Sequence, residues 1–145
     1  MEHSNIKSLS ELENFRAIFE YAPVGMIIMD DSNYIARANL AASKLFRKDR
    51  NEVIGSKIGD AINCINSFEG STGCGSSENC PACSLRNTLI KVSSTRIPCH
   101  GLEIEHTILV EGMEKKKWYR VNADPVTINE KRYLVITLDD ITEKK

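Results

Sequence analysis

The last third of the chain alternates along its length with a period of two, and this pattern constrains the fold more than any other feature. Side chains that favour a buried face recur at every second position there: Leu102, Ile104, His106, Ile108 and Val110. Two more extended segments follow at 118–126 and 133–138, after turns at Gly112 and at residues 129–131. Connections this short join antiparallel neighbours. The sequence therefore predicts a three-stranded antiparallel meander with one buried face.

The first part of the chain predicts a hairpin that completes the sheet. An apolar run at 24–29 ends in the turn cluster 30–33, and an extended segment resumes at 34–38. Asn39 then precedes a helical pattern at 40–46, whose first N–H groups an asparagine can cap. Strands at both ends of the chain with helices between them favour a single sheet.

Short helices fill the middle of the chain. Residues 51–62 predict helical turns, residues 84–92 predict a helix, and the intervening Gly- and Ser-rich segment predicts a loop. The expected fold class is α+β, with a five-stranded antiparallel sheet, short helices packed on one face and an N-terminal amphipathic helix.

The N-terminal helix is predicted from its cap and its apolar stripe. Residues 8–11, Ser-Leu-Ser-Glu, fit a capping box, and Pro23 ends the helix. Apolar residues recur at spacings of three and four: Leu9, Leu12, Phe15, Ile18, Phe19 and Ala22. Such a stripe packs either on its own domain or on a second copy, and the sequence leaves both open. We expect residues 1–20 to form a helical cap or dimerisation segment, and residues 21–145 to form one domain with a cysteine-rich loop at 64–83.

Charge and composition exclude several classes of partner. The 145 residues carry a net charge of −1, which gives no field that would attract nucleic acid or an anionic membrane. The short basic run at 115–117 is expected to be a solvated turn. No apolar run approaches the roughly 20 residues that span a bilayer, and the polar N-terminus has no signal-peptide core. The expected location is the cytoplasm, where structural disulfides are rare.

Four of the five cysteines crowd into one segment. Cys80 and Cys83 form a Cys-x-x-Cys pair, and Cys64 and Cys74 could complete the four sulfur ligands of a zinc ion or an iron–sulfur cluster. A second interpretation is a redox switch. In it, the position of Cys83 near a helix N-terminus favours its thiolate, and Cys80 is the resolving thiol. A third is stapling disulfides or inert buried thiols. All three stay open, and Cys99 is the thiol expected to take no part.

Catalytic motifs are not found in the sequence. It contains neither a Gly-rich phosphate loop ending in Gly-Lys-Ser/Thr nor a Gly-x-Ser-x-Gly elbow. His106 shares the strand face of Ile104 and Ile108, which favours a partly buried polar residue over a catalytic base. We therefore expect no catalytic residue and no enzymatic activity.

Four segments carry a likeness to a known family. They are residues 19–30, 38–46, 118–125 and 140–145, and in this order they resemble the PAS domain family. The Gly-Cys-Gly…Cys-x-x-Cys insertion resembles one in a subset of bacterial sensor PAS domains. The Asp140-Ile141-Thr142 triplet resembles the point where such domains pass into a downstream signalling helix.

The resemblance implies a sensory domain of a bacterial signal-transduction protein, such as a histidine kinase, a cyclase or a transcriptional regulator. Redox state, oxygen or metal would be sensed through the cysteine loop. The alternative is a non-sensing dimerisation or protein-interaction module, or a small-ligand-binding domain with inert cysteines. The expected partners are a second copy bound through the N-terminal helix and an effector domain after Lys145.

Two cofactors common in the family find no support here. The sequence has no Asn-Cys-Arg-Phe-Leu-like motif of the flavin photosensors, and residues 41–92 contain no histidine that could ligate haem. We therefore expect neither flavin nor haem. A small organic ligand remains open.

Overall fold

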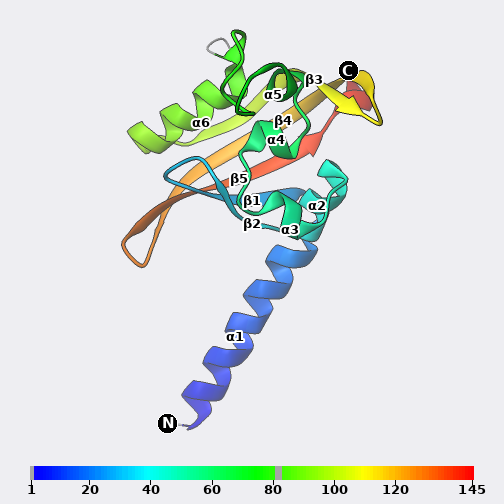
Figure 1. The fold of residues 1–145 in the computed structure, drawn as a ribbon. Helices are drawn as coiled ribbons and strands as arrows, with labels where there is room; N and C mark the ends of the chain where they lie inside the picture. Colours follow the sequence, from blue (N-terminus) through cyan, green and yellow to red (C-terminus); the bar gives the residue numbers. More distant parts are fainter. Residues whose placement is uncertain (1, 81–82) are drawn as a thin grey trace.

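A five-stranded antiparallel sheet forms the centre of the structure, a computed structural model that describes residues 2–80 and 83–145, with the backbone alone for residues 2–10. The strands lie in the order β2-β1-β5-β4-β3. Figure 1 shows the sheet and the helices around it. The strand bounds are β1 (Gly25–Asp30), β2 (Ile35–Ala38), β3 (Cys99–Val110), β4 (Met113–Ile128) and β5 (Lys131–Asp140). The predicted hairpin and meander are both confirmed.

The meander is longer than its alternation predicts. The basic run at 115–117, expected to be a turn, lies inside β4 and pairs with residues 106–108 of β3. The predicted turn at Gly112 is confirmed, and Glu111 and Gly112 both have positive φ there. The run extends as a strand because β3 provides a continuous ladder for its backbone hydrogen bonds, which outweighs the solvated side chains.

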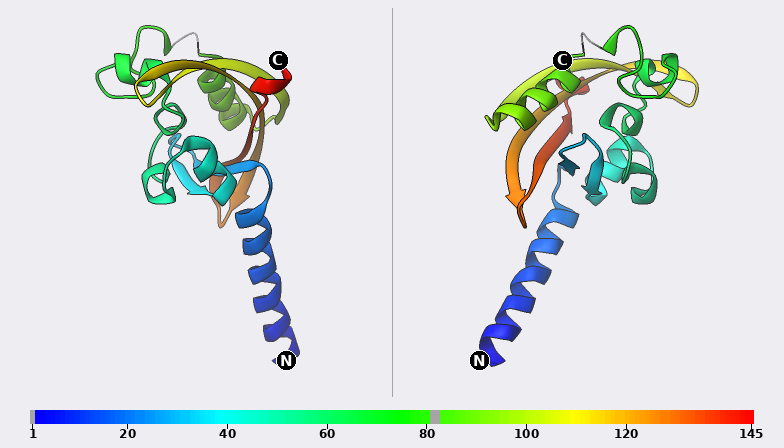
Figure 2. Two further views of the ribbon diagram at one scale, coloured as in Figure 1. Left: turned by 90° about the vertical axis from the view of Figure 1, so that its right-hand side faces the viewer. Right: turned by 60° about the vertical axis from the view of Figure 1, so that its left-hand side comes forward.

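Five helices cover the concave side of the sheet and enclose the core (Figure 2). They are α2 (Leu40–Phe46), α3 (Arg50–Val53), α4 (Ile58–Ala61), α5 (Ile65–Glu69) and α6 (Ser84–Thr95). The largest fully buried side chains come from both layers: Ile27, Met29, Ile35, Val53, Leu85, Val121, Leu134, Ile136 and Leu138. The sequence did not predict α5, because five polar-rich residues carry no helical period.

Asn39 is the predicted cap of α2 and also the junction of three elements. It is fully buried, and its Oδ1 atom accepts from the backbone N–H of Ala42 (3.0 Å) and of Met26 (2.9 Å). Its Nδ2 atom donates to the carbonyl oxygens of Phe19 (2.9 Å) and Val24 (3.0 Å). The amide is thus satisfied on both sides, and it fixes the end of the N-terminal helix against the hairpin.

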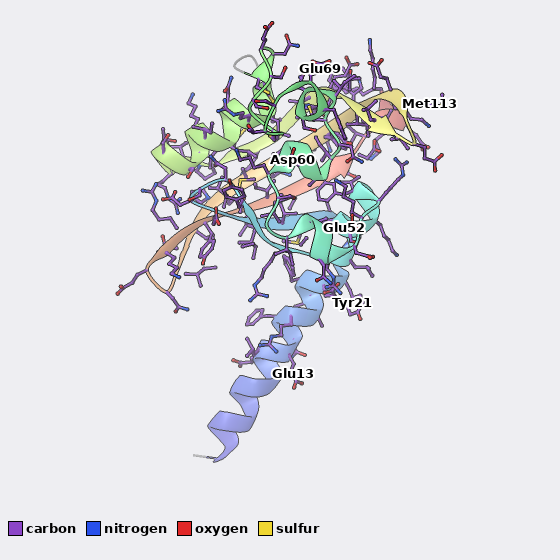
Figure 3. All side chains as sticks on the ribbon, in the orientation of Figure 1. Glu13, Tyr21, Glu52, Asp60, Glu69 and Met113 are labelled. Atoms are coloured by element: carbon purple, nitrogen blue, oxygen red, sulfur yellow. The ribbon has the colours of Figure 1, made fainter. Side chains whose placement is uncertain are left out.

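The N-terminal helix α1 (Glu2–Tyr21) begins earlier than the capping box at 8–11 predicts. It projects away from the domain in every view (Figures 1 and 2). Phe15 and Ile18 are 68% and 67% exposed, and Leu12 is also exposed. Figure 3 shows the side chains from Glu13 to Tyr21 standing clear of the sheet. Leu12, Phe15 and Ile18 therefore do not pack on their own domain in this structure, whereas Phe19 and Ala22, at the end of the stripe, are half-buried.

Candidate functional site

The four clustered cysteines line a single small cavity. Cys64, Cys74, Cys80 and Cys83 all border it, together with His106 of β3. The cavity measures about 20 Å³ for the centre of a water-sized sphere, which is roughly the room that one water molecule requires. All five cysteines of the chain are free thiols, and Cys99 does not line the cavity. We call this cavity, with its four cysteines and His106, the cysteine pocket.

Cys64 is fixed by the sheet. It is 7% exposed and forms an isolated antiparallel bridge with Ile108, two residues beyond His106. The N–H of Leu109 donates to the carbonyl of Asn63 (2.9 Å), and this hydrogen bond also holds residues 63–64 against β3. These contacts bring the start of α5 against β3, so a thiol and an imidazole more than 40 positions apart in the sequence border one space.

Cys74 is held by two residues of α4. Its N–H donates to Asp60 Oδ1 (2.9 Å). A Cβ atom added to Gly59 would lie 2.6 Å from the sulfur of Cys74 and 3.7 Å from the Cβ of Cys64. Only glycine at position 59 therefore allows Cys74 to approach α4 this closely, whereas the distance to Cys64 is an ordinary contact.

Cys80 and Cys83 lie on consecutive turns of the loop. The N–H of Cys80 donates to Ser77 O (3.1 Å), and the N–H of Cys83 donates to Cys80 O (3.0 Å). Cys83 is the N-cap of α6, where its sulfur accepts from the N–H of Arg86 (3.4 Å). The predicted place of Cys83 at the start of this helix is confirmed; residues 81–82 lie outside the described residues.

His106 joins the loop to the sheet. Its Nε2 atom lies 3.7 Å from the sulfur of Cys83. Its Nδ1 atom is buried and makes no hydrogen bond to any residue the structure describes. Burial lowers the pKa of His106, so the imidazole is neutral at neutral pH and keeps a lone pair available.

Burial also keeps two of the sulfurs protonated. It raises the pKa of Cys64, although the backbone N–H groups of Asn66 and Ser67 oppose this effect. Burial likewise raises the pKa of Cys74, and the neighbouring carboxylate of Asp60 adds to the rise. A metal ion would displace these protons, because only thiolates ligate.

A surface groove opens beside the cysteine pocket. Four residues line both the pocket and the groove and therefore separate them: Cys64, Asn66, Cys83 and His106. Glu103, Glu105 and Trp118 also line the groove, although on their strands they alternate with His106 onto the other face of the sheet. The groove therefore gives solutes a route to the thiols of Cys64 and Cys83.

The groove reaches the C-terminal segment. The backbone N–H of Trp118 donates to Thr142 Oγ1 (3.1 Å), and its backbone carbonyl accepts from the N–H of Ile141 (2.9 Å). Lys145 lies over the Trp118 ring, 4.9 Å from its centroid, and pairs with Glu103 (2.5 Å). Trp118, which lines the groove, thus contacts residues 141–145.

The four thiols line one cavity, but their sulfur atoms are not arranged to bind one metal ion. In residues 2–80 and 83–145, no three His, Cys, Asp or Glu side chains lie where one ion could bind them together. Metal binding would therefore require thiol side chains to turn toward a common centre. The four cysteines predicted as metal ligands line one cavity, and the binding of a metal ion by them stays a prediction.

Sequence reasoning missed three residues of this site. His106 was read as a buried polar residue, and its position between the buried Ile104 and Ile108 was the available signal. Gly59 and Arg86 gave no local signal, because their roles depend on contacts with the folded 72–76 loop.

A family profile described as PAS domain matches residues 23–143. No curated protein sequence matches the chain. No helix in the described part of the chain is long and apolar enough to cross a membrane.

Solved structures share the fold at low sequence identity. The PAS domain of an HTR-like protein from Haloarcula marismortui aligns at a TM-score of 0.63 and 13% identity, over 97% of this chain and 100% of that one. The PAS domain of nitrogen regulation protein NR(II) from Vibrio parahaemolyticus aligns at 0.56 and 17%, over 86% and 95%. A domain of a sensory box sensor histidine kinase/response regulator from Geobacter sulfurreducens aligns at 0.57 and 18%, over 89% and 94%.

Proposed function

Because the chain belongs to the PAS domain family, a family of regulatory, non-catalytic modules found in sensor kinases and transcriptional regulators, we propose that it is a signal-transduction sensor whose signal acts on the cysteine pocket. One observation carries the proposal: the four cysteines of residues 64–83 and one histidine of β3 line a single cavity. In our assignment, residues 21–145 form the sensor and residues 1–20 the dimerisation segment.

The leading signal is a thiophilic metal ion such as zinc. Thiolate and imidazole are the donors that zinc prefers. With bonds of about 2.3 Å to sulfur and about 2.0 Å to nitrogen, two tetrahedral ligand atoms lie about 3.5 Å apart. The sulfur of Cys83 and Nε2 of His106 are 3.7 Å apart, which is close to that separation. The cavity has room for one ion, and haem or flavin would not fit it.

The open arrangement of the other thiols is what a sensor requires. A ligand shifts a conformational equilibrium only if the two states bind it differently. Cys74 and Cys80 would have to turn inward to bind an ion held by Cys83 and His106, so binding would tighten the 72–80 loop. Because Trp118 follows Lys117, the cross-strand partner of His106, and holds residues 141–142, a shift of His106 would reach the C-terminal segment.

The redox alternative uses the same residues. Oxidation by a hydroperoxide would convert the Cys83 thiolate to a sulfenic acid and release water or alcohol, and Cys80 would then displace water to form a disulfide. The hydrogen bond from the N–H of Cys83 to the carbonyl oxygen of Cys80 (3.0 Å) keeps the two residues close and supports this pairing. An iron–sulfur cluster, the other cofactor expected from the sequence, would need a larger space than this cavity offers.

Trp118 fluorescence tests the metal proposal, because it is the chain's single tryptophan and faces the groove. Zn²⁺ added to reduced protein should change the emission at one equivalent, and the Cys80→Ser/Cys83→Ser variant should show no such change. Cys99→Ser is the matched control and should respond like the parent. A parent that gives no change in emission and retains no zinc after dialysis would refute the metal proposal.

A second proposal concerns α1. Leu12, Phe15 and Ile18 recur at a spacing of three on a helix that projects from the domain, and all three are exposed. A second copy of the helix would bury this stripe in a homodimer. Phe15→Glu/Ile18→Glu should yield a monomer in sedimentation experiments at concentrations where the parent is a dimer. A parent that is monomeric at all concentrations would refute this proposal.

A further inference from the structure

A second cavity lies beside the cysteine pocket and carries positive charge. It lies between the β1–β2 turn, α4, the 72–76 loop and α6, and measures about 190 Å³ for the centre of a water-sized sphere. Lys57 and Arg86 both line it, and none of the described lining residues has a carboxylate. Asp60 contacts the lining residue Cys74 but is not part of the lining, so the two cations that border the cavity favour an anionic ligand. We propose that this cavity, the Arg86 pocket, binds a small organic carboxylate.

Arg86 is the residue that selects the ligand. Its side chain is half-buried, and its guanidinium has neither a hydrogen bond nor an ion pair with any residue described in the structure. Its Nε atom lies 3.3 Å from the place where a Cβ at position 75 would stand, so Gly75 leaves the guanidinium its space. A planar guanidinium pairs with a carboxylate through two parallel hydrogen bonds, which is the partner that this arginine lacks.

The floor of the Arg86 pocket is apolar. Met29, Ile58 and Leu89 are each no more than 5% exposed and line it from the core side. A bare inorganic anion would leave this floor without a partner, whereas a short hydrocarbon tail would cover it. The cavity is smaller than the roughly 300 Å³ at which drug-sized sites begin. The ligand class is therefore a small monocarboxylate with a short aliphatic or aromatic tail.

The proposal for the Arg86 pocket does not depend on the thiol chemistry proposed above, but the Arg86 pocket shares a wall with the cysteine pocket. Cys74, Gly75 and Arg86 border both cavities. A bound carboxylate would rest against the loop that carries Cys74. The two proposals can nevertheless fail separately, because Cys80 and Cys83 do not line the Arg86 pocket.

Isothermal titration calorimetry with hexanoate and benzoate, and with their neutral amides, tests this proposal. At least one carboxylate should bind the full chain, and its amide should bind at least about tenfold more weakly, as expected from the loss of a charged hydrogen-bonded pair. Arg86→Gln should weaken carboxylate binding by a similar factor, and Lys57→Gln by less. Arg132→Gln, which removes an arginine outside this pocket, is the matched control and should leave binding unchanged.

Three results would overturn the proposal. They are no binding of either carboxylate at millimolar concentration, equal binding of acid and amide, and unchanged binding in a folded Arg86→Gln protein. Inorganic phosphate that binds as tightly as benzoate would overturn the role of the apolar floor. The Cys80→Ser/Cys83→Ser variant should keep its carboxylate affinity, so a defect in thiol sensing would not be mistaken for a defect in this pocket.

Discussion

The sulfur of Cys83 lies 3.7 Å from Nε2 of His106, and this contact links the cysteine loop to the central sheet. The two residues are 23 positions apart, one at the start of α6 and the other on β3. Cys83 thus contacts a strand that pairs with β4, and Trp118 of β4 holds residues 141–142 through hydrogen bonds of its backbone.

His106 should make the stability of the domain depend on pH. Its pKa in the folded state is lowered by burial, below the value near 6.5 of an unfolded chain. Between these two values the unfolded state binds more protons, so the free energy of unfolding should fall as pH drops through about 6.5, and the whole effect is present below the folded pKa. Urea unfolding at pH values on both sides of 6.5 measures this slope.

His106→Gln provides the comparison, because glutamine has similar size and does not titrate. The variant should lose part of the parent's decline in stability below pH 6.5. Equal slopes in parent and variant would show that His106 is not buried as a neutral imidazole.

Gly59→Ala should destabilise the domain, although alanine is the better helix former by about 1 kcal/mol. The new methyl would lie 2.6 Å from the sulfur and 3.0 Å from the Cβ of Cys74, and overpacking of this kind costs about 1–3 kcal/mol. The cost should shrink in a Cys74→Ala background, because the sulfur is then gone. A double-mutant cycle by chemical denaturation measures the coupling, and additive effects would contradict the close approach.

Asn39→Ala should be among the most destabilising single changes, at about 3 kcal/mol. It removes a helix cap, worth about 1 kcal/mol, and leaves buried backbone groups of Met26, Phe19 and Val24 without partners. Asn39→Asp keeps the acceptor for Ala42 and Met26 but places a carboxylate oxygen against the carbonyls of Phe19 and Val24, so it should also destabilise the domain. A loss below 1 kcal/mol for Asn39→Ala, measured by thermal or urea unfolding, would contradict this role.

Cys64 and Cys74 should react slowly with iodoacetamide in the native protein at pH 8. Burial raises the pKa of both thiols, which reduces the reactive thiolate fraction. Peptide mass spectrometry after timed alkylation should show each reacting several-fold more slowly than in urea-unfolded protein. Equal native and unfolded rates at either cysteine would place it at the surface instead.

The sheet could be predicted from sequence because its signals are local. The period of two in residues 102–110 and the turn residues after each strand depend on neighbours within a few positions. Asn39 likewise could be predicted as a helix cap, because it directly precedes the helical pattern at residues 40–46. The predicted start of α1 was wrong, because a capping-box pattern at 8–11 does not stop a helix from extending further toward the N-terminus.

The cysteine pocket could be predicted only in part. Its four thiols are close in sequence, so their proximity in space was a local inference. His106 and Gly59 join them because the start of α5 bridges to Ile108 and the 72–76 loop folds over α4. Such long-range contacts leave no periodic or motif signal in a single chain.

The metal content of protein purified without oxygen, measured together with its absorption spectrum, tests the central claim most directly. If the cysteine pocket binds a single ion, we expect about one zinc-class ion per chain and no cluster absorption in the visible range. The Cys80→Ser/Cys83→Ser variant should lose the ion and keep its fold. A parent free of bound metal, even after incubation with Zn²⁺ and dialysis, would contradict the account. Iron and sulfide together with a visible band that bleaches in air would contradict the single-ion site and identify a cluster instead.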